Sequence, residues 1–315
     1  MLIILGVVLP VFLIVGAGYG AVKLKLFPDA GVGALMGFTQ NFAIPCLLFL
    51  ALYRLDFSAV FDLALVFSFY FAALVCFALG YVAGRRLFGM TPGESVVMGF
   101  ACFFSNSVLL GLAITERAYG TEALAPNFAL ISIHAPILYL VGITAMEIAR
   151  ADGRSAAETA RVTLIAMFRN PISMSSGAGI FFNLAGVPLP LAVVEAAEML
   201  GRAALPAALF GLGGVLSRYR IRSTLGPAAA VTVVACLVFP AIVYALTVFV
   251  FALPEDFVRS ATVMGAMAPG VNAYVFSSMY DRATGEVATA VIVATAASVA
   301  TTAGWLWLLG GAAIG

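Results

Sequence analysis

The sequence predicts an all-α polytopic membrane protein with ten transmembrane helices arranged as two repeats of five. Of its 315 residues, 63% are hydrophobic and only 10% are charged, whereas a soluble domain has about 25% charged residues. Apolar runs of about 20 residues recur along the whole chain, and each is long enough to cross a hydrocarbon core of about 30 Å. A weak internal repeat divides these runs into two sets. Because the apolar runs extend along the whole chain, a soluble domain with a single membrane anchor is excluded.

The ten predicted spans follow one another with short connections. The first has no basic stretch before it and is followed by Lys23 and Lys25, the reverse of the charge order in a cleaved signal peptide, so we expect it to be retained. The sixth is the shortest, and the seventh is long enough to be tilted. The spans are predicted at residues 2–22, 32–53, 58–84, 94–114, 128–148, 171–187, 189–216, 226–253, 257–280 and 287–310.

The basic residues predict the orientation, because they favour cytoplasmic loops. With the N-terminus outside, the outside loops hold only Arg54, Arg117 and Arg259. This distribution predicts that the protein lies in a bacterial-style inner (plasma) membrane with both of its termini outside. The longest loop, residues 150–170, is then cytoplasmic, with the pattern of an amphipathic helix. The twelve basic residues of the inside loops are Lys23, Lys25, Arg85, Arg86, Arg150, Arg154, Arg161, Arg169, Arg218, Arg220, Arg222 and Arg282.

Three matches in order define the repeat. Pro10 precedes a Gly-Ala-Gly triplet at 16–18, and Pro171 precedes the same triplet at 177–179, an offset of 161. At that offset "IPCLLFLAL" (44–52) matches "LPAALFGLG" (205–213), and "ERAYG" (116–120) matches "DRATG" (281–285) at offset 165. We therefore predict a first five-helix repeat at 1–150, a connecting loop at 151–170 and a second repeat at 171–315.

An odd number of spans per repeat inverts the second copy in the membrane. Such inverted repeats create a pseudo-two-fold axis in the membrane plane, with a binding site near the midplane. Two related conformations, each open to one side, follow from this symmetry. The pattern is typical of a transporter.

Two spans carry residues that should interrupt them at equivalent places. Pro269 removes a helix N–H, Gly270 is flexible, and Asn272 is expected to cap a new helix start. The fourth span has the polar run Ser105-Asn106-Ser107. Broken backbone at membrane depth is tolerated where it lines a cavity or is buried in protein. A proline kink with Ser and Asn hydrogen-bonded between helices is the structural alternative, but two breaks at matching positions favour a transport site.

Half-helix starts suit anions. Their free N–H groups and about half a positive charge attract a carboxylate. Asn side chains add donors and acceptors without a buried charge. The candidate substrate-binding residues are Ser105, Asn106, Ser107, Pro269, Gly270, Asn272, Tyr274 and Asn41.

Four stretches carry a resemblance to the auxin efflux carrier family, which includes bacterial malonate and organic-acid carriers. They are "NFAIPCLLF" (41–49), "GFACFFSNSVLLGL" (99–112), "RNPISMSSGAGIFF" (169–182) and "AMAPGVNAYVFSSMY" (266–280). In one place the chain departs from the family, since Leu112-Ala113 stands where members often have a proline.

The resemblance implies a fold shared with the bile-acid/sodium symporters, in the bile/arsenite/riboflavin-type transporter superfamily. In that fold the fourth and ninth spans unwind and cross. Spans three to five and eight to ten form a transport domain, and spans one, two, six and seven form a scaffold. The family moves small carboxylates, by an elevator-like shift of one domain against the other. Compared with many plant members the central loop is short, so regulation by this loop is not expected.

Three further polar residues inside the predicted spans are candidates for gating or coupling. Arg202 is the one basic residue deep in a span, four residues after Glu198. The pair is interpreted as an anion-attracting group with its gate or, with more weight, as a structural ion pair. Arg202 and Asn41 share the repeat offset, so both are expected at the domain boundary. His134, the only histidine, could couple protons to transport, although hydrogen-bonded packing is favoured.

The predicted function is a secondary carrier of small organic anions, and not an enzyme. A sodium-coupled bile-acid-type symporter is the alternative, and a channel or sensor on a carrier fold is less favoured. No HExxH motif, paired intramembrane aspartates or G-x-x-x-x-G-K loop is present. We expect no cofactor, no bound metal and no nucleic acid. The coupling ion is expected to be Na⁺ or H⁺. The lipid bilayer surrounds the protein, and a second copy of the chain is a candidate partner.

Overall fold

The computed structural model describes residues 2–56, 61–150, 171–219 and 225–310, and all regular elements in these ranges are helical. The predicted amphipathic helix of the central loop lies largely outside them. Seven helical segments of the described chain are long and apolar enough to cross a membrane. These are Gly6–Lys23, Asp29–Tyr53, Leu63–Arg86, Thr121–Ala149, Leu191–Arg218, Leu225–Val250 and Thr284–Leu308.

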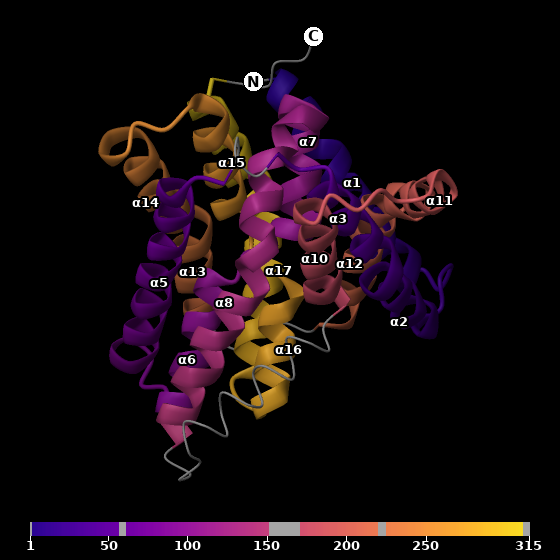
Figure 1. Ribbon diagram of the computed structural model, residues 1–315. Helices are drawn as coiled ribbons and strands as arrows, with labels where there is room; N and C mark the ends of the chain where they lie inside the picture. The colour runs from indigo at the N-terminus through magenta and orange to yellow at the C-terminus, as the bar shows by residue number, and fades with distance from the viewer. Residues whose placement is uncertain (1, 57–60, 151–170, 220–224, 311–315) are drawn as a thin grey trace.

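The first half of the chain contains four of these segments and one interrupted helix (Figure 1). Its α-helices are joined in places by single π or 3₁₀ turns, labelled η. In order they are α1 (Leu2–Lys23), α2 (Asp29–Phe38), η1 (Thr39–Ala43), α3 (Ile44–Tyr53), α5 (Leu63–Arg86), α6 (Pro92–Phe103), η2 (Ser107–Gly111), α7 (Leu112–Tyr119), η3 (Thr121–Leu124) and α8 (Ala125–Arg150).

The second half begins with a short helix and also contains an interrupted one. Its elements are α10 (Pro171–Leu184), α11 (Leu191–Arg202), α12 (Ala204–Arg218), α13 (Leu225–Val233), η4 (Val234–Val238), α14 (Phe239–Ala245), η5 (Leu246–Val250), α15 (Glu255–Gly265), α16 (Val271–Tyr280) and α17 (Thr284–Leu308).

Three of the ten predicted spans are not among the seven helical segments that are long enough to cross a membrane, each for a physical reason. The fourth and ninth are interrupted at 104–106 and 266–270. The sixth, α10, has 14 residues and covers only about 21 Å at 1.5 Å per residue. The seventh is among the seven segments as Leu191–Arg218, with a turn at Ala203 between α11 and α12.

Local capping sets two helix starts at the edges of the predicted spans. The Asp62 carboxylate accepts from the N–H groups of Ala64 (2.6 Å) and Leu65 (3.0 Å), which starts α5 later than predicted. Thr91 and Glu94 form a reciprocal capping box at the start of α6. Both caps satisfy N–H groups that a helix start leaves free.

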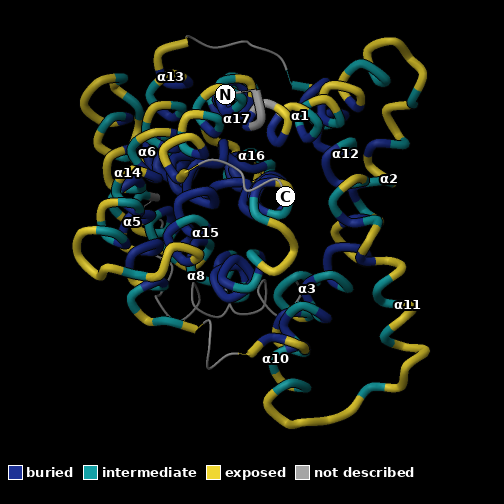
Figure 2. Tube along the Cα trace, turned by 90° about the horizontal axis from the view of Figure 1, so that it is seen from above, coloured by how far each residue is buried: buried dark blue, intermediate teal, exposed yellow. Residues whose placement is uncertain are grey.

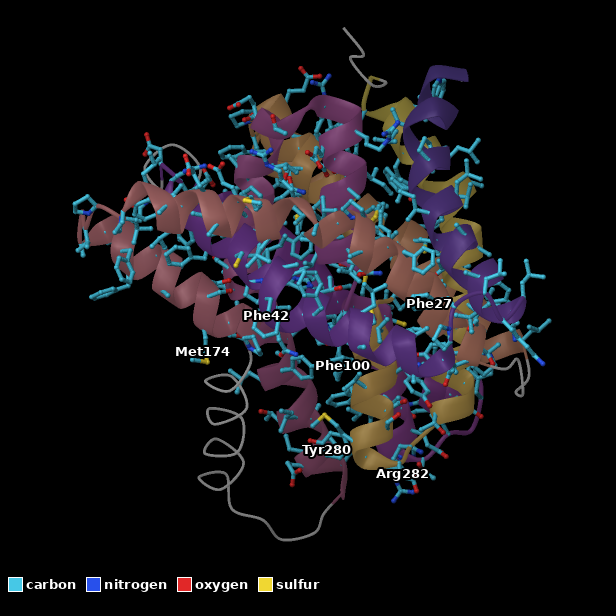
Figure 3. The ribbon with its side chains drawn as sticks, turned by 90° about the vertical axis from the view of Figure 1, so that its right-hand side faces the viewer. Phe27, Phe42, Phe100, Met174, Tyr280 and Arg282 are labelled. Atoms are coloured by element: carbon cyan, nitrogen blue, oxygen red, sulfur yellow. The ribbon has the colours of Figure 1, made fainter. Side chains whose placement is uncertain are left out.

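The helices divide into two groups by packing. One contains α1, α2, α3, α10, α11 and α12, and the other contains α5, α6, α8 and α13 to α17. Figure 2 shows the groups side by side, with α11 exposed at the outer edge of the first. The start of α1 and the end of α17 lie at the same end of the molecule (Figure 1). Tyr280 and Arg282 lie at the opposite end (Figure 3).

Large buried aromatic side chains hold the second group together beside the two interruptions. The Phe100 ring of α6 stacks on the Phe276 ring of α16 with centroids 3.9 Å apart, and both side chains are fully buried. Gly142 of α8 makes room for them, since a Cβ there would lie 2.4 Å from the Phe100 ring. This packing fixes α6, α8 and α16 relative to one another, and so positions the site below.

Candidate functional site

The two interrupted helices meet at their breaks. The N–H of Asn106 donates to the carbonyl of Ala268 (2.8 Å), and the N–H of Gly270 donates to the carbonyl of Phe104 (3.1 Å). These bonds form an isolated antiparallel bridge between Ser105 and Pro269. Each break therefore satisfies backbone groups of the other, as buried unwound backbone requires.

The positions of the breaks follow from the local sequence. Pro269 and Gly270 interrupt the ninth predicted span as expected, but the capping role of Asn272 is wrong. Gly270, with extended backbone, is the residue before α16, and no side chain caps that start. Asn272 is the second residue of α16 and lines the cavity beside it. The other break lies at 104–106, upstream of Leu112, so the proline absent there is not needed to make it.

A small cavity of about 150 Å³ lies at this crossing, on the seam between the two helix groups. It collects most of the predicted site residues. Gln40, which also lines it, was missed; its only sequence signal is its position beside Asn41. We call this cavity the central pocket; its lining is Gln40, Asn41, Ile44, Phe104, Ser105, Asn106, Ser107, Val108, Leu109, Ile131, His134, Ala135, Pro171, Ile172, Gly270, Val271 and Asn272.

The polar groups of the central pocket are uncharged. Within the described part of the chain, the side chains of Asn106 and Asn272 make no hydrogen bond to protein, so both are free for a ligand. The hydroxyls of Ser105 and Ser107 bond to each other at 2.7 Å. Asn41 donates to the carbonyl of Gly37 (2.8 Å), which leaves its side-chain oxygen as an acceptor.

The electrostatics of the pocket come from two helix starts. The helical run from Ser107 to Tyr119 and the helix α16 both begin at its wall. Each start contributes free N–H groups and about half a positive charge. Because α6 and α15 end at the same crossing, and a helix end carries about half a negative charge, the net positive charge at the pocket is below one unit and comes without a basic side chain. The arrangement is suited to a small anion.

His134 lies in the wall of the pocket and is 2% exposed. Neither ring nitrogen has a hydrogen-bond partner in the described residues; the backbone of Ser105 faces the ring, but not in hydrogen-bonding geometry. The imidazole is therefore packed in the interior as expected, but the expected hydrogen bond is not formed. The rings of Phe69, Tyr70 and Phe104 surround the imidazole, with centroids 5.3 to 6.2 Å away.

Two predicted site residues do not line the central pocket. Pro269 is buried in the crossing itself. Tyr274 lies one turn further along α16, with its ring centroid 4.4 Å from that of Tyr219. Tyr219 directly follows α12. This pair joins the two helix groups.

Arg202 lies near the middle of the candidate span Leu191–Arg218. It is the last residue of α11, where the helix breaks, and its side chain is 80% exposed within the protein. Glu198 lies 3.6 Å from Arg202 but only 2.7 Å from Arg54. Sequence reasoning missed Arg54, because 144 residues separate it from Glu198.

These charged residues line a second, larger cavity of about 620 Å³, which we call the outer cavity. Like the central pocket, it lies between the two helix groups. Its lining is otherwise mainly apolar, and it consists of Pro10, Val11, Ile14, Leu47, Leu50, Ala51, Arg54, Leu112, Ala113, Glu116, Arg117, Thr121, Leu124, Phe128, Glu198, Gly201, Arg202, Leu205, Pro206 and Leu209.

A thin apolar layer separates the two cavities. On each of three helical segments, one residue faces the central pocket and another, three positions away, faces the outer cavity. Three positions along a helix correspond to about 4.5 Å. The layer is made of the pairs Ile44 and Leu47, Leu109 and Leu112, and Ile131 and Phe128.

Comparison with known proteins identifies the family. The sequence model described as "Membrane transport protein" matches residues 3–306. A protein of Rhizobium meliloti (strain 1021) named "Putative malonate transporter" is 23% identical over 97% of this chain and 96% of its own length. An "Uncharacterized transporter" of Methanothermobacter thermautotrophicus is 28% identical over 74% of each chain. The "Uncharacterized transporter YfdV" of Escherichia coli (strain K12) is 21% identical over 96% of this chain and 97% of its own. The chain therefore belongs to the membrane transport protein family, which is the auxin efflux carrier family that its motifs resemble.

Proposed function

We propose that this membrane transporter is a secondary active carrier of small organic anions, with carboxylates as substrates and the central pocket as their binding site. The observation that carries the proposal is the meeting of two helix starts at a pocket with free Asn106 and Asn272 side chains. Helix starts bind carboxylates through free N–H groups. The two amides add directional hydrogen bonds without the desolvation cost of a buried charge.

The size of the central pocket supports a small substrate. A volume of about 150 Å³ equals roughly five water molecules at about 30 Å³ each. A three- or four-carbon acid matches this space, and a steroid-sized bile acid does not. The name of the Rhizobium meliloti relative points to malonate, an acid of this size. This favours the organic-acid carrier over the bile-acid-type symporter.

An elevator-type alternating-access mechanism is supported by the seam. Both cavities lie between the two helix groups, and an apolar layer about one turn thick divides them. The breaks and His134 belong to one group, while Gln40 and Asn41 belong to the other. Sliding the first group against the second would carry the substrate past the apolar layer without opening a continuous pore.

An inverted five-plus-five repeat is the proposed basis for the two conformations. Gly18 packs against the backbone of Phe210, and Gly179 packs against that of Phe49. The offset of 161 relates Gly18 to Gly179 and Phe49 to Phe210, so each repeat places the same contact on the other. A two-fold relation between the repeats accounts for this reciprocity.

The proposed location is the inner membrane with both termini outside, from the distribution of basic residues. The outer cavity would then face the outside, since it is lined by residues at the end of α7, near the start of α1. Either H⁺ or Na⁺ would drive transport. A dimer of two copies of the chain is a further proposal.

Uptake by proteoliposomes tests the function. Purified protein should accumulate labelled malonate when a proton, sodium or voltage gradient is imposed one at a time, and the effective gradient identifies the coupling. Protein-free liposomes give the background. Absence of uptake for malonate, acetate, propionate and succinate under every gradient would refute the carrier proposal. Uptake of a bile acid instead would favour the alternative symporter.

A further inference from the structure

We propose that His134 is a direct ligand of the substrate, and that a dicarboxylate dianion binds together with one proton held on this imidazole. The inference rests on the proposed function, since it concerns the same pocket. It begins from a buried polar side chain without a partner. An imidazole that is 2% exposed, with both nitrogens unpaired in the described chain, is costly. The ring lies in the wall of the central pocket with neither nitrogen exposed to it, and a turn of the ring about its side-chain bonds would bring a nitrogen into contact with a bound molecule.

The aromatic rings around His134 explain its orientation. Phe69 and Tyr70 of α5 and Phe104 at the break pack around the imidazole. The Tyr70 hydroxyl is engaged elsewhere, because it donates to the carbonyl of Leu130 at 2.8 Å. The ring is thus held by apolar contacts, and its two nitrogens have no hydrogen-bond partner in the described residues.

The charge balance of the pocket sets the substrate class. The two helix starts supply at most about one positive charge in total, and the ends of α6 and α15 at the same crossing reduce it. No Asp, Glu, Lys or Arg lines the pocket in the described chain, and Tyr70, which donates its hydroxyl proton, is the one ionisable group among the rings packed on His134. One carboxylate therefore takes up all of this positive charge, and a second has none to balance it. An uncompensated charge in such surroundings is expensive.

His134 can supply the missing charge. As a neutral imidazole it has one donor and one acceptor, so its N–H can bind the single carboxylate of a monoanion. As an imidazolium it has two donors and one positive charge, which matches the second carboxylate of a dianion. The proton comes from the aqueous phase on binding and returns to it on release, and no covalent bond changes. The site would thus accept propionate alone and malonate with a proton.

Calorimetry on the purified full-length protein tests this. Malonate and propionate are titrated at about pH 7.5 in two buffers with different heats of ionisation, which reports the protons taken up per bound anion. We expect about one proton for malonate and none for propionate. Malonate binding to the parent without proton uptake would overturn the proposal.

Two substitutions separate ligand from packing. His134→Leu removes every polar atom of the side chain and should weaken the binding of both anions roughly ten- to a hundredfold. The thermal midpoint should not fall, because the substitution removes an unpaired buried polar group. His134→Gln keeps an N–H donor but cannot take a proton. It should bind propionate like the parent, bind malonate more weakly and take up no proton. Unchanged affinity of His134→Leu for both anions would refute the ligand role.

The two proposals fail in different ways. If the parent protein binds and transports no carboxylate, the proposed function fails. If the parent binds malonate and propionate, and Asn106→Ala binds both more weakly, but the His134 variants match the parent in affinity and proton uptake, only the role of His134 fails.

Discussion

Gly18 of α1 lies so close to α12 that a Cβ on it would be 2.0 Å from the carbonyl oxygen of Phe210. The counterpart contact, 161 residues on, has the same character: a Cβ on Gly179 of α10 would be 2.6 Å from the carbonyl oxygen of Phe49 in α3. Neither approach is possible for a residue with a side chain unless the helices separate. These two contacts join the halves of the first helix group.

Gly18→Ala and Gly179→Ala should therefore destabilise the protein. Each added methyl meets backbone, which cannot move aside as a flexible side chain would, so we expect a loss of about 1–3 kcal/mol in the free energy of unfolding. Thermal unfolding of the purified protein in detergent measures the effect.

The chain provides a matched control for each of these variants. A Cβ on Gly16 or Gly177, two residues earlier on the same helices, would meet nothing within 4 Å. Gly16→Ala and Gly177→Ala should keep or raise the midpoint, because alanine favours a helix by up to about 1 kcal/mol over glycine. Equal midpoints for all four variants would contradict the close packing.

Local patterns predicted the breaks well because their causes are local. Pro269 cannot donate to a helix, and the polar run 105–107 has no apolar face to bury, so both interruptions could be placed from sequence. The repeat placed the breaks at equivalent positions, and they were therefore expected to share one site. Most of the central pocket followed from this reasoning.

What depends on distant contacts could not be predicted. Glu198 was paired with Arg202 by helix spacing, but its shorter contact is with Arg54, the residue that follows α3. The break at Ala203 was not predicted, although Pro206, which has no N–H to donate to the carbonyl of Arg202, follows it by three residues. The unpaired nitrogens of His134 depend on which groups α5 and the break bring near it, and a single sequence does not contain that information.

Asn106→Ala and Asn272→Ala should each weaken substrate binding. Both remove a side-chain amide that is free to bond to a ligand in the central pocket, and the expected cost is about 1–3 kcal/mol, or roughly ten- to a hundredfold in apparent affinity. Uptake kinetics in proteoliposomes at matched protein amounts measure this. Ser278→Ala, at an exposed position of α16, is the control and should leave the kinetics unchanged. Normal kinetics in both Asn variants would remove the central pocket as the substrate site.

Cysteine labelling tests the orientation. The η3 turn after α7 and the loop between α5 and α6 lie at opposite ends of the molecule (Figure 1). Glu122 of η3 and Leu87 of the loop are both exposed. In a background with Cys46→Ser, Glu122→Cys should react with an impermeant thiol reagent in intact cells, and Leu87→Cys only after lysis. Labelling in the reverse pattern would invert the topology.

A cross-link between the two helix groups should stop transport if one group slides against the other. The Tyr219 and Tyr274 rings, from opposite sides of the seam, have centroids 4.4 Å apart. The Phe27 and Phe210 rings, 5.4 Å apart, join α12 to the segment before α2, within one group. Each pair is replaced by cysteines in the Cys46→Ser background and joined by a short bifunctional thiol reagent. We expect uptake to fall to background when the tyrosine positions are joined and to persist when the phenylalanine positions are joined, relative to the same variants without reagent. Full transport with positions 219 and 274 quantitatively joined would exclude a sliding movement along this seam.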